Sequence, residues 1–254
     1  MYFVFDLDGA IHFKGEQMSE EMRDAIRNLA ENEHEVIFTS AKPVREMLSV
    51  IPQEFHHYTM IGGNGSLIAA NGTVVHSKPF SSDQMKEITQ FIETYEATYL
   101  IDGDWDYDYT GPDDHPIVQH IDPANIAELV PLDDLPSVVK VLILSSKDHD
   151  QFAEKLKEAD VHVRKSDDKN VLDIRPRGIH KRNALENLGV DKDNYVAFGS
   201  DGNDLTLLDH AHHSVIIGNH GELAAIAKEV IQNVEDVEQK IIGKIKELSE
   251  RYAF

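Results

Sequence analysis

Two acidic residues follow a predicted strand close to the N-terminus of this chain. Residues 2–5 are apolar, as in a buried strand, and the chain continues with Asp6, Leu7, Asp8 and Gly9. Side chains two residues apart on an extended segment point the same way, and parallel sheets bind ligands at the carboxyl ends of their strands. Asp6 and Asp8 can therefore address one site, and this pair suits a divalent cation together with a phosphate.

Gly9 fits the same interpretation. Glycine lets the backbone leave the strand sharply and lets a charged ligand approach the main chain. An Asp-x-Asp-Gly segment is, however, equally compatible with a polar turn after a strand. The elements that surround it have to decide between the two.

The composition limits the partners that we expect. The 254 residues include 46 acidic and 24 basic side chains, which gives a formal net charge of -22. This charge repels nucleic acids and anionic membrane surfaces, so we expect neither as a partner. A protein this acidic has to offset its own field locally if it binds a phosphorylated ligand, with a metal ion, a few placed cations or backbone N–H groups.

Cysteine is absent, which excludes disulfides, thiolate metal sites and a cysteine nucleophile. The N-terminus has no basic leader segment, and no apolar run has the length needed to span a bilayer. We therefore expect a soluble, cytoplasmic protein.

Strands and helices alternate at both ends of the chain, as in βαβ units. Near the start we expect strands at 2–5 and 35–39, a helix capped by Ser19, a helix from Pro43 and a hairpin over 66–75 that turns at Asn71-Gly72. Near the end we expect a helix over 181–188, a strand at 195–198, a short helix from Asn203, a strand at 214–217 and further helices.

The middle of the chain follows a different pattern. Between about residues 81 and 177 the alternation is less regular, with strands at 138–144 and 171–175 and a helix over 151–159. The sequence predicts an α/β fold with a Rossmann-like parallel-sheet core formed by 1–80 and 178–254. Residues 81–177 form an inserted α+β domain in this prediction.

Several short motifs occur in a fixed order along the chain, and together they resemble one family. They are Asp6-Leu7-Asp8-Gly9, Ser40-Ala41-Lys42-Pro43, Asn64-Gly65, Pro176-x-Gly178-Ile179-x-Lys181 and Gly199-Ser200-Asp201-Gly202-Asn203-Asp204-Leu205. In this order the chain resembles the haloacid dehalogenase superfamily and, within it, the Cof-like phosphatases. Their α/β core is interrupted by a type C2 α+β cap, which matches the predicted inserted domain.

The resemblance implies a chemistry for the two acidic residues at the first strand. Asp6 attacks phosphorus to give an aspartyl-phosphate, which water then hydrolyses. Asp8 protonates the leaving alcohol and later deprotonates the attacking water, while its backbone carbonyl binds Mg²⁺. Phosphate binding falls to Ser40, Lys181, Asn203 and Gly9. Read without the family, Lys181 is a solvated residue at a helix start, although the helix dipole disfavours a cation there.

The expected Mg²⁺ ligands are Asp6, Asp8, Asp204, Asp201 and Ser200. Two positions depart from the family pattern: Ala10 replaces the usual Thr, and Ser200 stands where the family has the first acidic residue of its metal motif. Three arrangements are open. Ser200 binds weakly or through water, Asp201 takes over the role, or Asp204 carries it with Asp6. Fewer charged ligands predict weaker Mg²⁺ binding.

The predicted function is Mg²⁺-dependent hydrolysis of a small phosphomonoester, either a sugar phosphate or a phosphorylated cofactor. Two alternatives stay open: a phosphomutase, and a catalytically weak regulatory protein that binds a phosphorylated metabolite. The sequence does not indicate an oligomeric state.

Two further groups of residues invite a function. The histidines at positions 56, 57, 115, 120, 210, 212 and 213 lack the spacing of a zinc site, so we expect no second metal there. The alternation of Trp105, Tyr107 and Tyr109 predicts one face of a strand, which either packs or stacks on a sugar.

Overall fold

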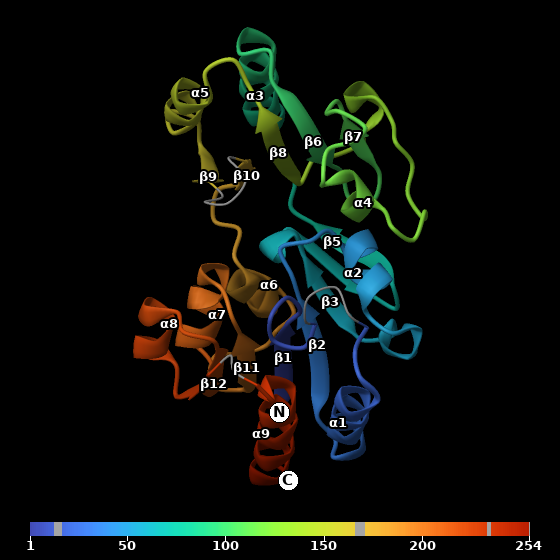
Figure 1. The fold of residues 1–254 in the computed structure, drawn as a ribbon, viewed down its shortest axis with the longest axis vertical. Coiled ribbons are helices and arrows are strands. Elements are labelled where there is room, and N and C mark those ends of the chain that lie inside the picture. Colours follow the sequence, from blue (N-terminus) through green and yellow to red (C-terminus); the bar gives the residue numbers. More distant parts are fainter. Residues whose placement is uncertain (13–16, 166–170, 233–234, 254) are drawn as a thin grey trace.

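The computed structural model describes residues 1–12, 17–165, 171–232 and 235–253, and within these ranges the strands form two sheets (Figure 1). The large sheet has the strand order β13-β12-β11-β1-β2-β3-β4-β5, and the small sheet has the order β7-β6-β8-β10-β9. The strands of the large sheet are β1 (Tyr2–Asp6), β2 (Glu35–Thr39), β3 (Thr59–Gly62), β4 (Leu67–Ala70), β5 (Thr73–Ser77), β11 (Tyr195–Gly199), β12 (His213–Ile217) and β13 (Glu229–Ile231). Those of the small sheet are β6 (Thr98–Asp102), β7 (Tyr107–Tyr109), β8 (Lys140–Ser145), β9 (Val161–Lys165) and β10 (Leu172–Pro176).

The large sheet is parallel from β13 to β3, and the predicted α/β class is confirmed. β1 lies between β2 and β11, with Asp6 in register with Thr39 and Phe5 in register with Phe198. The loops after these three strands therefore meet at one edge of the sheet. The hairpin of β4 and β5 extends the sheet in the antiparallel sense, and Asn71 and Gly72 adopt positive φ in its turn, as predicted.

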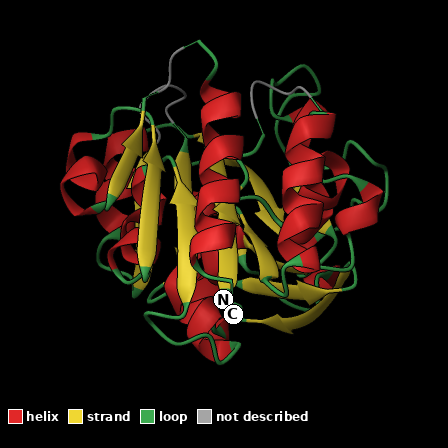
Figure 2. Cartoon of the chain, turned by 90° about the horizontal axis from the view of Figure 1, so that it is seen from below, coloured by secondary structure: helices red, strands yellow, loops and turns green. Residues whose placement is uncertain are grey.

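Helices cover both faces of the large sheet (Figure 2). The helices are α1 (Glu20–Glu31), α2 (Val44–Val50), α3 (Ser82–Thr94), α4 (Val118–Ile121), α5 (His149–Leu156), α6 (Lys181–Asn187), α7 (Leu205–Asp209), α8 (Gly221–Ile226) and α9 (Val237–Arg251), with short 3-10 turns η1 (Gln53–Phe55), η2 (Gly63–Gly65), η3 (Leu132–Asp134) and η4 (Gly202–Asp204). Phe3 and Phe5 of β1 pack with α1 and α9, whereas Val4 packs with α6, α7 and α8 on the opposite face.

The small sheet is apolar on one face and polar on the other. Its apolar face packs on α3 and α5. On β10, Asp173 and Arg175 are paired with Arg164 and His162 of β9, and residues two apart share a face. This polar face lies toward the large sheet, because Arg164 forms an ion pair with Asp201 there.

Most expected elements are present. Ser19 caps α1 by accepting a hydrogen bond from the Met22 amide at 3.1 Å. Helix α5 begins earlier than predicted because Asp148 caps it, and the predicted sequence of helices after β12 is interrupted by the edge strand β13. The two sheets draw their strands from within the predicted domains, whose boundaries stay a prediction. No helix in the described residues is both long and apolar enough to cross a bilayer.

Candidate active site

A buried lysine lies between two buried carboxylates where β1 ends. Lys181, the first residue of α6, forms ion pairs with Asp6 Oδ1 and, at 2.7 Å, with Asp204 Oδ1. Burial raises the pKa of Asp6 to about 7 even though Lys181 opposes the rise. Burial also disfavours the charge on Lys181, but the two carboxylates outweigh it and raise the lysine pKa. The pKa values of Asp6 and Lys181 therefore depend on the charges of the other members of this triad.

Asp204 also holds the loop that follows β11. Its Oδ2 atom accepts hydrogen bonds from the amides of Ser200 at 2.9 Å and Asp201 at 3.1 Å. Because Oδ1 pairs with Lys181, both oxygens of this fully buried carboxylate have protein partners. Asp204 therefore fixes the loop and the lysine in place at the same time.

Asp8 follows the end of β1, two residues after Asp6, and is exposed. Lys42 Nζ contacts its Oδ2 at 2.6 Å, and His12 Nδ1 lies 3.8 Å from its Oδ1. Burial would raise the pKa of Asp8, but His12 and Lys42 outweigh it and lower the pKa to about 2. Asp8 is thus a carboxylate at neutral pH in the absence of a ligand.

Ser200 directly follows β11 and contacts the loop that carries Asp8. Its hydroxyl donates to the Asp8 backbone carbonyl at 2.7 Å. Gly9 has φ +81, and a Cβ at this position would lie 2.7 Å from Ser200 Oγ. The close approach of these two loops therefore requires glycine at position 9.

Ser40 follows β2, beside Asp6. It is buried, its Oγ accepts a hydrogen bond from the Lys42 amide at 3.0 Å, and its own amide donates to the Ile61 carbonyl at 2.9 Å. The hydroxyl hydrogen of Ser40 is therefore available for a ligand oxygen. Asn203 joins the same region, with its Oδ1 atom 3.5 Å from Lys181 Nζ.

Asp201 points away from this group. Arg164 of β9 contacts its carboxylate at 3.3 Å, so the residue bridges the two sheets. Burial would raise the pKa of Asp201, but Arg164, the hydrogen bond from the Gly202 amide and the charge of Lys181 together outweigh it and lower the pKa.

The structure thus brings some of the predicted site residues together and separates others. Asp6, Lys181 and Asp204 are in direct contact, and Ser200 contacts the main chain of Asp8. No group of three or more His, Cys, Asp or Glu side chains within the described residues is arranged to hold a metal ion. As metal ligands, all five predicted residues stay predictions.

The other residues considered in the sequence have structural partners. His210 Nε2 lies 2.7 Å from Arg182, and His213 contacts Glu229 at 2.8 Å. Tyr107 packs under the Arg45 guanidinium, whose Cζ atom is 4.9 Å from the ring centroid, which favours the packing role over sugar stacking.

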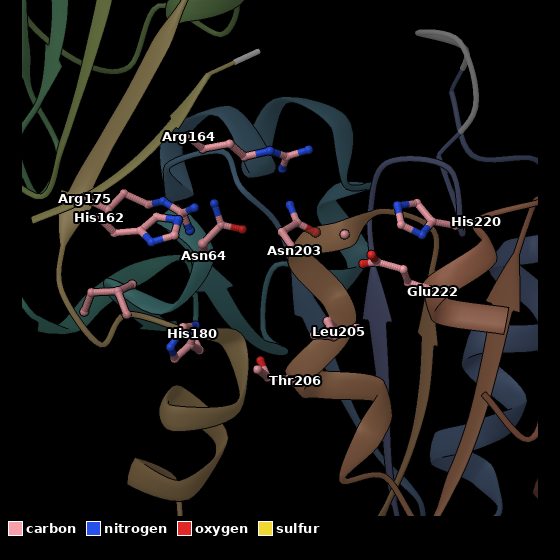
Figure 3. Close-up of a pocket in the computed structure, with 12 residues that line it drawn as sticks. Asn64, His162, Arg164, Arg175, His180, Asn203, Leu205, Thr206, His220 and Glu222 are labelled. Carbon is pink, nitrogen blue, oxygen red and sulfur yellow. The ribbon is translucent and has the colours of Figure 1, made fainter. Parts of the chain in front are cut away.

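A cavity of about 350 Å³ lies between the two sheets, next to Asn203 of the site (Figure 3). Asn64, Arg164, Arg175 and Asn203 are among the residues that line it. Sequence reasoning gave no role to Lys42, Arg164 or Arg175. Lys42 lies inside the Ser40-Ala41-Lys42-Pro43 motif. No short sequence motif marks the two arginines, because it is the pairing of β9 with β10 that brings them to the site.

Residues 3–239 match the family model for haloacid dehalogenase-like hydrolases, and the chain belongs to this family. The predicted family and the enzyme class, a phosphoric monoester hydrolase of the haloacid dehalogenase type, are thereby confirmed. The chain is also similar to the 5-amino-6-(5-phospho-D-ribitylamino)uracil phosphatase YitU of Bacillus subtilis (strain 168). The two are 24% identical over 238 residues, which cover 85% of this chain and 86% of the relative.

Solved structures share the fold at lower identity. A haloacid dehalogenase-like hydrolase from Bacteroides thetaiotaomicron superposes with a TM-score of 0.80 at 18% identity, covering 97% of this chain and 98% of the other. The subclass IIB sugar phosphatase BT4131 superposes with a TM-score of 0.73 at 16% identity, with the same coverage.

Proposed function

We propose that this chain is a Mg²⁺-dependent phosphatase that hydrolyses small phosphomonoesters through an aspartyl-phosphate on Asp6. The observation that carries the proposal is the buried Lys181 between Asp6 and Asp204, at the edge where parallel strands present their loops. A nucleophilic carboxylate with a fixed cation beside it is what phosphoryl transfer needs, since catalysis rests on positioning and charge stabilisation.

The oxygen atoms at this edge fit Mg²⁺, a hard cation that takes few protein ligands and keeps several waters. The Asp6 carboxylate, the Asp8 carbonyl and the Ser200 hydroxyl would hold it, and the last two are already 2.7 Å apart. Asp204 and Asp201 stay in the proposed set. In the free protein, however, Asp204 is committed to Lys181 and two amides, and Asp201 to Arg164. When bound, the cation neutralises charge on the transferring phosphoryl group.

The proposed reaction has two displacements. An Asp6 oxygen forms a bond to phosphorus while the ester P–O bond breaks, and the leaving oxygen takes a proton from Asp8. Asp8, now a carboxylate, removes a proton from a water whose oxygen attacks the same phosphorus. The bond between Asp6 and phosphorus breaks as the water oxygen bonds to phosphorus, which releases inorganic phosphate, returns Asp6 to a carboxylate and leaves Asp8 protonated again. Ser40, Lys181, Asn203 and the Gly9 main chain hold the phosphoryl oxygens.

Asp8 has to gain a proton before the first step. Its low pKa in the free protein reflects the ion pair with Lys42 and the contact with His12. A phosphate dianion placed beside Asp8 adds a like charge and competes for Lys42, and both effects raise the proton affinity of the carboxylate. We infer that substrate binding itself prepares Asp8 as the acid.

The substrate is a small metabolite, a sugar phosphate or a phosphorylated cofactor. In this proposal residues 81–177 act as the cap, and the cavity of about 350 Å³ beneath them suits a small molecule. The relatives support the same class: one is named for a phosphorylated ribitylaminouracil and another is called a sugar phosphatase.

The test is phosphate release from a panel of sugar phosphates, nucleotides and p-nitrophenyl phosphate, with and without Mg²⁺. Asp6→Asn keeps the shape of the side chain and removes the nucleophile, and Asp193→Asn at an exposed position is the matched control. We expect metal-dependent release that disappears only in Asp6→Asn.

Two other outcomes would replace the proposal. Phosphate transfer to a second sugar hydroxyl, with little free phosphate, would identify a phosphomutase. Thermal stabilisation by phosphorylated compounds without any turnover would identify a binding protein.

A further inference from the structure

The cavity between the two sheets adjoins the proposed phosphate site at Asn203. Asn203 lines the cavity and lies 3.5 Å from Lys181 Nζ. Asn64 also lines the cavity, and its backbone N–H donates to the Ser40 backbone carbonyl at 2.9 Å. A phosphate held by Ser40 and Lys181 would therefore direct the rest of its molecule toward this space.

Three buried polar atoms on the cavity wall have no hydrogen-bond partner within the described parts of the chain. They are Asn64 Oδ1, Arg175 Nε and His220 Nδ1. Buried polar atoms in native proteins are nearly always paired. Three such atoms around one cavity indicate that it is built for a polar ligand.

Arg175 carries the strongest part of this signal. The residue is only 5% exposed, and its Nε atom lies 3.5 Å from Asp173 Oδ1 without forming a hydrogen bond. It is in register with His162 on the polar face of the small sheet. Burial lowers the pKa of Arg175, as expected of a cation that its neighbours only partly compensate.

The other charged groups divide the cavity into two sides. Figure 3 shows Arg175 and Arg164 on the side of the small sheet, and Glu222 with His220 on the opposite side. Arg164 is engaged with Asp201. The histidines at 162 and 180 have lowered pKa values, first because of burial and then because of Arg175, so they are neutral at neutral pH.

We propose that this cavity holds the leaving group of the substrate and that Arg175 binds a second anionic group on it, a carboxylate or a phosphate. The inference rests on the proposed phosphatase function and names its substrate class. A chain with a net charge of -22 repels such a dianion elsewhere, so its recognition needs a placed cation of this kind. Arg175 offers the geometry that carboxylates and phosphates prefer.

Binding can be tested without turnover. Thermal shifts of the whole protein would be compared for butylphosphonate, 4-phosphonobutyrate and 1,4-butanebisphosphonate, together with the two- and three-carbon members of each series. We expect at least one length at which the second anion tightens binding about tenfold or more over the alkylphosphonate. The carboxylate and bisphosphonate arms identify which anion is preferred. Equal binding across every matched pair would overturn the proposal.

Turnover gives an independent measurement. The ratio of kcat/KM for 3-phosphoglycerate over glycerol 3-phosphate, and for fructose 1,6-bisphosphate over fructose 6-phosphate, should exceed about ten for one pair in the native chain. Arg175→Gln should bring that ratio close to one, and Arg175→Lys should restore part of it. Arg177→Gln, at an exposed arginine paired with Asp160, is the matched control and should keep the native ratio.

These readouts separate the failure of this proposal from failure of the proposed function. Hydrolysis of p-nitrophenyl phosphate with no preference in any matched pair would leave the phosphatase and exclude the second-anion site. No hydrolysis of any compound, with selective binding of the dianionic phosphonates, would remove the enzyme and keep the site. If Arg175→Gln fails to fold, the comparisons on the native chain still decide the matter.

Discussion

Ser200 donates its hydroxyl hydrogen to the backbone carbonyl of Asp8 across 2.7 Å, so two of the predicted metal ligands satisfy each other in the free protein. A serine contributes no charge to a cation site, and ligand charge is a main determinant of affinity for divalent cations. Lys181 meanwhile pairs with both Asp6 and Asp204, and Lys42 pairs with Asp8. In the free protein, the carboxylates of Asp6 and Asp8 therefore already have lysine partners before any metal binds.

Ser200→Asp should convert this arrangement into a stronger magnesium site. Without metal, the new carboxylate lies next to Asp8 and lowers the melting temperature by charge repulsion. With Mg²⁺ the order should reverse, and the apparent Kd for the ion should fall about tenfold. Titration calorimetry and melting curves across a Mg²⁺ series measure both effects, with Ser200→Ala as the uncharged control. Equal Mg²⁺ affinity in all three proteins would show that position 200 takes no part in the site.

Lys181→Met should destabilise the protein as well as inactivate it. The substitution leaves Asp6 and Asp204 buried without their cation, and breaking a buried ion pair from one side costs about 3–5 kcal/mol. Urea unfolding of the variant, set against Lys192→Met at an exposed lysine, measures the difference in free energy of unfolding. A loss below about 1 kcal/mol would mean that the triad is held by other contacts.

Asp102→Asn should weaken the attachment between the two sheets. The fully buried Arg45 contacts Asp102 Oδ1 at 2.5 Å and also donates to the carbonyls of Ile121 and Trp105. Neutralising Asp102 leaves the buried guanidinium with only the longer ion pair to Glu46, at 3.6 Å, among its ion pairs in the described residues, and the expected loss is about 3 kcal/mol in the free energy of unfolding. Chemical denaturation beside the exposed control Asp113→Asn provides the comparison. Matching curves would contradict this account of Arg45.

His34 should make stability depend on pH. Its Nε2 atom lies 3.0 Å from the Ser249 carbonyl, and its buried Nδ1 has no partner within the described residues, so a second proton would be unpaired. Burial lowers the pKa of His34 below its ordinary value of 6.5. The unfolded chain then binds more protons below pH 6.5, so this contribution to stability is complete above that pH and is lost as the pH falls.

His34→Gln should flatten this part of the pH profile, because glutamine does not titrate. Unfolding free energies between pH 5 and 8 would be compared for the native chain, His34→Gln and the exposed control His76→Gln. The control should retain the native slope. An unchanged slope in His34→Gln would assign the acid sensitivity to other groups.

The sequence predicted the large sheet well because its signals are local. Residues 2–5 and 35–39 are apolar runs of strand length, Ser19 is a good helix cap, and Asn71-Gly72 favours one type of turn. Motif order then brought Asp6 and Lys181 to one site although 175 positions separate them. What the sequence could not show is which cation each carboxylate meets, since that depends on side-chain packing between loops.

The small sheet was less predictable for a related reason. Strand β9 reads as a mixed polar segment, and only its pairing with β10 places Arg164 and Arg175 on one face beside the site. Likewise Asp201 looked like a metal ligand by position, while the partner that it contacts lies on a distant strand. Pairings between remote segments are set by tertiary structure, and one sequence alone does not record them.

The contact between Arg45 and Asp102 bears on how such proteins can be recombined. Arg45 belongs to α2, directly after the loop that carries Ser40 and Lys42, whereas its carboxylate partner belongs to the small sheet. A chimera that exchanged residues 81–177 for the equivalent segment of a relative would leave the buried guanidinium of Arg45 without this carboxylate unless the donor segment supplied an acid at the position of Asp102. An exchange of this segment should therefore include position 45.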